Sequence, residues 1–288
     1  MRIERDIRPT CLHAVMRLLG QWLGWTLIPL LMTLAPAARA ATVTLDLTAL
    51  GNLTLAAGQS QTFTLGGSTT TVNGVTTTTS ALTVTVLAMT YAGRAIPTTT
   101  TGGQTTIGTL TTSGAGQNTY QSALNFSASG AGVTNSLEGT RRGVPRDNPA
   151  VDAGGGKTDF IEILLSSAAT LDAATFVDQN VRFGVGRSSL VWASDTTGTG
   201  SISTGDAISA ATSLASASFG GAASDAFMIG ASGGGSRFNI STMTLSYTPT
   251  VTTTVAAAAL TAPSPVPLPA SAPLLLAALG GLAFLRRR

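Results

Sequence analysis

The chain has 288 residues, a formal net charge of +3, one cysteine (Cys11) and one histidine (His13). The positive charge lies at the two ends, because Ala41 to Leu285 holds eight Lys/Arg against eleven Asp/Glu, a net charge of −3. This segment has no basic stripe for nucleic acid. Without Cys or His it can form no disulfide, no ordinary zinc or copper site, and no Ser-His-Asp or Cys-His catalytic arrangement.

The N-terminal 40 residues have the order of a secretory signal. Arg17 precedes a largely apolar run over residues 18–34, and the small residues Ala38 and Ala40 follow it. This order predicts cleavage by signal peptidase between Ala40 and Ala41. Met16 is an alternative start to Met1, and it would leave a compact signal.

The C-terminal 23 residues have three parts in a fixed order. A proline-containing motif comes first, an apolar run to Leu285 follows, and three arginines end the chain. The 16 residues from Ala270 to Leu285 would span about 24 Å as a helix, which predicts one short transmembrane segment with its arginines on the cytoplasmic side. The motif is Val266, Pro267, Leu268, Pro269 and Ala270, and the tail is Arg286, Arg287 and Arg288.

This C-terminal arrangement, Val266 to Arg288, closely resembles the PEP-CTERM family of sorting signals in its VPLPA variant. The resemblance implies that an exosortase recognises Val266–Ala270 and cleaves nearby. It further implies transient anchoring in the inner membrane of a Gram-negative bacterium. Delivery to the cell surface or the extracellular matrix would follow, in connection with exopolysaccharide and biofilm production.

Residues 41–250 between the two signals are predicted to form one all-β domain. In the first 90 of them only Asp46 and Arg94 are charged and 26 are Thr, a composition that favours strands over disorder. Apolar residues alternate over 42–48 and 81–87, which predicts strands. The stretches 66–70 and 98–103 are read as loops or hairpin ends. A glycosylated, mucin-like stalk is the alternative for the Thr runs.

The second half of this domain shows sharper strand patterns. Strands are predicted over 159–165, 180–185, 225–230 and 236–247, separated by Gly- and Ser-rich pieces. A short helix is an option over 206–217. Many short strands with such punctuation indicate a β-sandwich of the jelly-roll type. Residues 251–265, rich in Thr, Ala and Pro, are read as a spacer to the sorting signal.

One segment has the spacing of a degenerate calcium loop. Asp195, Gly200, Ile202 and Asp206 fall at positions 1, 6, 8 and 12 of a 12-residue EF-hand-type loop, whose ligands include positions 1, 3, 5 and 12. Positions 3 and 5 are threonines, and position 12 is the shorter Asp. We therefore expect a polar β-hairpin turn and no cofactor, with calcium at Asp195 and Asp206 as the alternative.

The body also offers candidate residues for two other chemistries. A glycan hydrolase needs paired carboxylates, and the candidates are Glu138, Asp159 and Glu162. Asp159 and Glu162 have opposite parity on one strand and should face opposite sides. We expect all three to be solvated charges at strand edges.

A carbohydrate-binding module would use an aromatic platform, for which the candidate is Trp192. It ends a predicted strand, and we expect it to pack in the core or at its rim. The cluster of Arg141, Arg142 and Arg146 could meet an acidic polysaccharide, but we expect a solvated loop beside Asp147. The sequence therefore predicts a non-enzymatic, structural or adhesive surface protein, with carbohydrate binding as the alternative and glycan hydrolysis as a third reading.

Overall fold

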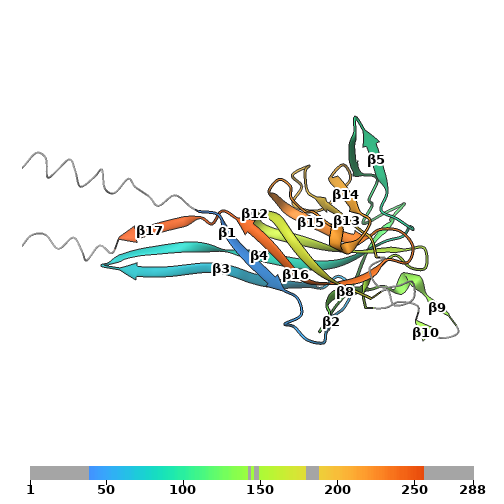
Figure 1. Ribbon diagram of the computed structural model, residues 1–288, viewed down its shortest axis with the longest axis horizontal. Helices are drawn as coiled ribbons and strands as arrows, with labels where there is room; N and C mark the ends of the chain where they lie inside the picture. Colours follow the sequence, from blue (N-terminus) through green and yellow to red (C-terminus); the bar gives the residue numbers. More distant parts are fainter. Residues whose placement is uncertain (1–38, 142–143, 146–148, 180–187, 256–288) are drawn as a thin grey trace, which may run out of the picture. The chain divides into compact units, whose positions relative to one another are not determined.

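The computed structural model describes residues 39–141, 144–145, 149–179 and 188–255 (Figure 1). These residues form β-strands and two single-turn 3₁₀ helices, η1 (Ser136–Glu138) and η2 (Leu214–Ser216). The strands are β1 (Ala41–Asp46), β2 (Leu53–Leu55), β3 (Ser60–Val72), β4 (Val75–Tyr91), β5 (Thr98–Thr101), β6 (Gln104–Ile107), β7 (Thr119–Ser127), β8 (Gly130–Thr134), β9 (Thr140–Arg141), β10 (Val144–Pro145), β11 (Val151–Asp152), β12 (Thr158–Asp178), β13 (Leu190–Ser194), β14 (Ala207–Ala211), β15 (Ser224–Ala231), β16 (Arg237–Tyr247) and β17 (Val251–Val255).

The predicted all-β class is confirmed. Fifteen of the described strands join in one hydrogen-bonded sheet, with the path β1-β16-β8-β7-β4-β12-β15-β13-β14-β6-β5. Residues 1–38 of the predicted signal peptide, the sorting motif with its arginine tail, and the predicted strand over 180–185 lie outside the described residues. Within the described part of the chain, no helix has the length and apolar character needed to cross a membrane.

Strand β12 lies at the centre of the sheet. Its first part, Thr158 to Leu165, pairs antiparallel with β4, and most of the same stretch pairs with β15 on the other side. Its second part, Ala169 to Asp178, pairs instead with β16. One strand therefore belongs to two different sets of neighbours along its length.

The hydrophobic core occupies both faces of the central strands. On β12, Ile161 and Ile163 belong to the larger buried cluster, whereas Phe160 belongs to the smaller one. The same alternation divides β15, where Ile229 faces the larger cluster and Met228 the smaller. Apolar side chains at consecutive positions are buried because side chains alternate between two covered faces.

The strands predicted from alternation are present. On β4 the side chains of Leu82, Val84 and Val86 are fully buried, as their spacing predicts. On β1, Leu45 is buried, and Leu47 just beyond the strand is buried as well. The predicted strands over 159–165, 225–230 and 236–247 lie within β12, β15 and β16.

Three local predictions differ from the structure. Residues 66–70, read as a loop, lie within β3, where Gly66 and Gly67 adopt φ of 67° and 79° without ending the strand. Residues 98–103, read as a loop or hairpin end, hold the turn of a hairpin at Gly102 and Gly103 as predicted, but 98–101 form the strand β5. The optional helix over 206–217 is wrong, because β14 pairs with β13 and only η2 is helical. Tertiary pairing here outweighs the helix propensity of the alanines.

The described residues divide into two compact units. The larger comprises residues up to 68 and from 78 to 251, and the smaller comprises 69–77 with the residues from 252 onward. In the smaller unit the β3–β4 hairpin turns at Asn73 and Gly74, with φ of 52° and 76°. This is the residue pair that a tight two-residue hairpin turn favours. The hydroxyls of Thr71 and Thr76 hydrogen-bond across it at 2.9 Å.

Candidate functional site

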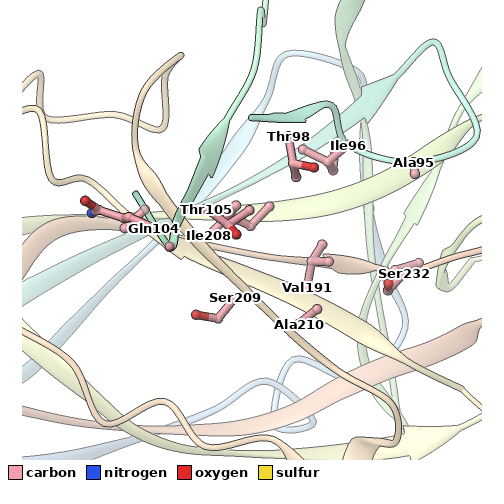
Figure 2. A pocket seen from close by; sticks show the side chains of 13 residues that line it. Ala95, Ile96, Thr98, Gln104, Thr105, Val191, Ile208, Ser209, Ala210 and Ser232 are labelled. Carbon is pink, nitrogen blue, oxygen red and sulfur yellow. The ribbon is translucent and has the colours of Figure 1, made fainter. Parts of the chain in front are cut away.

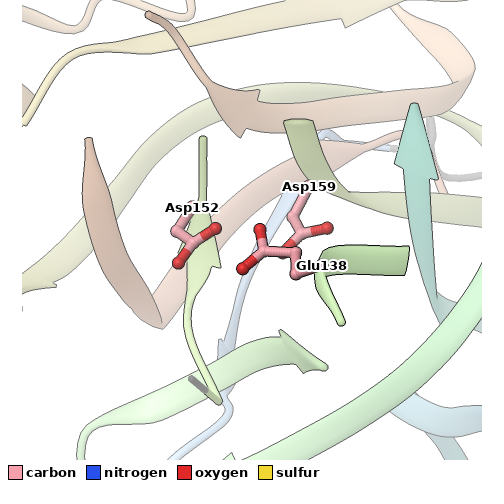
Figure 3. Close-up of side chains that lie close together, drawn as sticks. All are labelled: Glu138, Asp152 and Asp159. Carbon is pink, nitrogen blue, oxygen red and sulfur yellow. The ribbon is translucent and has the colours of Figure 1, made fainter. Parts of the chain in front are cut away.

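Three buried carboxylates meet at one end of the central strands (Figure 3). Glu138 ends η1, Asp152 ends β11, and Asp159 is the second residue of β12. Each offers an oxygen that lies within 4.8 Å of the others. We call Glu138, Asp152 and Asp159 the acidic cluster.

The prediction that Glu138 and Asp159 are solvated is wrong. Their exposed fractions are 9% and 0%, and that of Asp152 is 2%. Buried carboxylates need polar partners, and the cluster has them on several sides. Asp159 Oδ1 accepts hydrogen bonds from Thr90 Oγ1 at 2.6 Å and from Asn135 Nδ2 at 2.9 Å.

Asn135 connects the cluster to the local backbone. Its Oδ1 accepts a hydrogen bond from the Leu137 N–H at 3.0 Å, which caps η1 and places Glu138 one residue further on. Its amide group donates to Asp159 at the same time. One side chain therefore fixes both the turn that carries Glu138 and the carboxylate of Asp159.

Asp152 is paired with the guanidinium of Arg237 at 3.2 Å. Burial raises the pKa of Asp152, and this outweighs the lowering by the charge and hydrogen bond of Arg237 and by hydrogen bonds involving Glu138 and Gly154. Burial penalises the charged form, so the Asp152 carboxyl binds a proton more tightly than a solvated carboxyl does.

The spacing of the three carboxylates would also allow them to share a metal ion. Carboxylate oxygens within reach of one another are the ligands that a hard divalent cation such as Ca²⁺ prefers, and Glu138, Asp152 and Asp159 are the residues that could supply them. The wall beside them is glycine: a Cβ on Gly154 would lie 3.1 Å from Glu138 Oε1. The spacing of these carboxylates does not by itself show that an ion binds here.

Glu162 lies on the other face of β12, as its parity with Asp159 predicts. It shares that face with Phe160 of the smaller core cluster, and its exposed fraction is 8%. The prediction of a solvated side chain is therefore wrong for Glu162 too. Its Oε1 accepts a hydrogen bond from the Ile202 N–H at 2.8 Å. Burial, followed by the charge of Asp206, raises the pKa of Glu162 against the opposing effect of that hydrogen bond.

The segment from Asp195 to Asp206 connects β13 and β14 and is the polar hairpin connection that was predicted. Asp195 Oδ2 accepts from the Gly200 N–H at 2.6 Å, and Asp195 Oδ1 accepts from the Gly198 N–H at 2.7 Å. Asp206 Oδ2 accepts from the Ser203 N–H at 2.7 Å. Both carboxylates named for calcium thus accept hydrogen bonds from the loop's own main chain.

The electrostatics of Asp195 agree with this arrangement. Desolvation raises the pKa of Asp195, but the N–H groups of Gly200, Gly198 and Thr199 and the Thr197 hydroxyl together bring it below its ordinary value. A carboxylate that accepts several backbone hydrogen bonds favours its charged form. The loop is organised by its two aspartates.

Trp192 packs against the larger core cluster, as predicted. Its ring lies edge-on to Phe219, with ring centroids 5.2 Å apart. Packing against the core accounts for a tryptophan at this position without a carbohydrate ligand. The side chains of Arg141, Arg142 and Arg146, and Asp147 beside them, lie outside what the structure describes.

A hollow of about 720 Å³ lies beside the β5–β6 hairpin (Figure 2). Its wall combines apolar and small polar side chains, including Ile96, Thr98, Gln104, Val191 and Ile208. The residues that line it carry no charge and no aromatic ring. The hollow therefore has no carboxylate, imidazole or amine side chain that could act as a general acid or base.

Comparison of the chain with protein-family models, with curated proteins and with solved structures finds no match.

Proposed function

We propose that the protein is an exported component of the cell surface or extracellular matrix, sorted by an exosortase, with a structural or adhesive role in an extracellular polymer layer. The observation that carries this proposal is the order of parts at the C-terminus. A Val266–Ala270 motif, an apolar segment and an arginine tail follow one another, behind a chain that begins with an export signal.

The described body supports a role without turnover. Its buried acidic cluster contrasts with the open cleft in which a glycan hydrolase places two carboxylates on either side of a sugar. Its candidate sugar platform, Trp192, packs on the core. The body contains no cysteine and therefore no disulfide, so its stability comes from strand pairing and core packing.

We further propose that the sheet folds over itself as a sandwich of the jelly-roll type. The support is β12, which pairs with β4 and β15 along its first part and with β16 along its second. A strand that changes neighbours part of the way along is the device by which sandwiches turn corners.

The test is the intact mass of the protein from cells with and without exosortase activity. The proposal expects a wild-type form that begins at Ala41 and ends near Val266–Ala270. The deficient strain should retain Arg286–Arg288. An identical, uncleaved C-terminus in both strains would overturn the sorting proposal and leave a plain membrane tail.

A matched pair of variants sharpens this test. Replacing both Pro267 and Pro269 by Ala removes the extended conformation that proline imposes on the motif, and processing should fail. Pro265→Ala changes a proline one residue outside the motif, and processing should continue. Equal processing of the two variants would contradict recognition of the motif.

A further inference from the structure

A pocket of about 500 Å³ lies where three loops of the larger unit meet. One loop follows β4, the second connects β11 to β12, and the third connects β15 to β16. Two of its lining residues are cations and none is acidic. The lining consists of Arg94, Ala153, Gly155, Gly156, Lys157 and Gly234.

The pocket gathers much of the described positive charge. Between residues 41 and 255 the structure describes three Lys/Arg side chains, Arg94, Lys157 and Arg237. Arg237 is paired with Asp152. The other two both line this pocket, in a body whose net charge is negative.

Apart from the two cations and Ala153, the wall consists of glycines, which present main-chain groups. Gly155 and Gly156 adopt left-handed φ of 53° and 81°, which L side chains rarely adopt. The loop is held closed by a hydrogen bond from the Lys157 N–H to the Gly154 carbonyl at 2.7 Å. A second hydrogen bond, from the Gly235 N–H to the Ala153 carbonyl at 3.3 Å, joins two of the loops. Exposed main-chain N–H groups in such turns donate to anions.

The acidic cluster of Glu138, Asp152 and Asp159 opposes an anion here. Glu138 lies next to the pocket, since a Cβ on the lining residue Gly155 would lie 3.5 Å from the Cβ of Glu138. The cation of Arg237 offsets the charge of the neighbouring Asp152, with which it is paired. The charge of Glu138 should therefore weaken anion binding without abolishing it.

We propose that this pocket binds an oxyanion, such as the carboxylate or sulfate group of an acidic glycan. Two cations with main-chain donors suit a charged oxygen group, whereas the lining has no aromatic ring for a neutral sugar. Only the glycan as the source of the anion rests on the proposed function. The affinity of the pocket for an oxyanion does not.

The test is calorimetric titration of the full chain in detergent with sodium sulfate, with oligogalacturonate and with neutral maltohexaose, at low ionic strength. The acidic probes should bind and the neutral one should not. Arg94→Gln and Lys157→Gln should each weaken binding about tenfold, because each removes a charge-assisted hydrogen-bond donor.

Glu138→Gln should tighten binding, because it removes the opposing charge. Its matched control is Asp225→Asn, which removes one negative charge at an exposed position of β15 and should leave binding unchanged. Circular dichroism confirms that each variant is folded.

The outcomes separate the two levels of the proposal. Binding of sulfate without oligogalacturonate supports the oxyanion pocket and overturns the glycan as its source. Binding that survives in the double variant Arg94→Gln/Lys157→Gln, or the absence of any anion binding, overturns the pocket. Neither result bears on C-terminal processing, which the mass measurement tests separately.

Discussion

Glu162 carries a raised pKa on one face of β12, with a clear consequence for stability. Its pKa is above the ordinary 4.5, chiefly through burial and then through the charge of Asp206. Such a group binds its proton more tightly in the folded chain than in the unfolded chain. Its stabilising contribution is therefore complete below pH 4.5 and is lost as the pH rises through the folded pKa.

Glu162→Gln should raise the free energy of unfolding at pH 7 and flatten its dependence on pH above 4.5. The amide cannot ionise, and its oxygen can still accept the hydrogen bond from the Ile202 N–H. Urea unfolding at several pH values measures both effects. Glu162→Ala is the control, since it also removes the acceptor and should destabilise. If the free energy of unfolding of Glu162→Gln depended on pH as the wild type does, the raised pKa of Glu162 would not be the cause of that dependence.

Arg237→Ala should lower the free energy of unfolding at pH 7 by about 2–4 kcal/mol. It leaves the Asp152 carboxylate buried without its counter-charge, and the guanidinium's 35% exposure keeps the loss below that of a fully buried pair. The raised pKa of Asp152 adds a pH signature, because the loss should shrink as the pH falls and Asp152 is protonated.

Arg237→Lys is the matched control for this prediction. It keeps the positive charge and gives up the planar guanidinium, so the loss should be smaller. Thermal or urea unfolding of the two variants at pH 4 and pH 7 decides the matter. An equal loss for Arg237→Ala at both pH values would point to packing of the side chain instead of charge.

At the scale of the elements, the glycine at the β7–β8 hairpin makes a sharp prediction. Gly130 has φ of 108°, and a Cβ there would lie 2.1 Å from the carbonyl oxygen of Ile240 on β16. Because both the backbone and its neighbour must shift, Gly130→Ala should cost about 3 kcal/mol or more.

Gly114→Ala provides the comparison, measured by the same chemical unfolding. Gly114 also has a positive φ, of 82°, but a Cβ there meets nothing within 4 Å. It should therefore cost only the backbone strain, about 1–2 kcal/mol. Similar losses for the two variants would mean that β16 gives way to the added methyl group.

Strands were predictable where one face is apolar and the next residue polar, as in β1 and the second half of β4. Strand β3 was not predicted, because two consecutive glycines are typical of loops, although a long hairpin tolerates them. Strand β5 has only threonines, so it lacks the alternation that distinguishes a strand from a loop. Strand β5 forms because it pairs with β6, and the sequence of β5 alone does not indicate this pairing.

The acidic cluster could not be predicted from the sequence for a related reason. Asp152 sits on a two-residue strand that pairs with β16, and Glu138 sits on a single helical turn. Only long-range pairing brings these elements to the start of β12. Parity placed Asp159 and Glu162 on opposite faces, but parity does not say that both faces are covered.

At the scale of the whole molecule, charge is segregated between the ends and the body. The arginines of both ends produce the high overall pI of about 9.6, whereas the segment from Ala41 to Leu285 is net negative. Within the described body, Arg94 and Lys157 gather at one pocket. Electrostatic properties measured on a precursor will therefore differ from those of a form that has lost its ends.

The pairing of β1 with β16 joins residues near the two ends of the described chain. Strands β1 and β16 lie side by side (Figure 1). Ala41 lies opposite Tyr247, and the hydroxyls of Thr42 and Ser246 hydrogen-bond across 204 positions of sequence. Contacts between such distant residues are slow to form, because a very long loop must close first. A chain that crosses a membrane N-terminus first would keep β1 without this partner until β16 has emerged. If the chain is exported as we propose, this part of the sheet would be completed only late in translocation, and β1 would remain unpaired while the rest of the chain crosses the membrane.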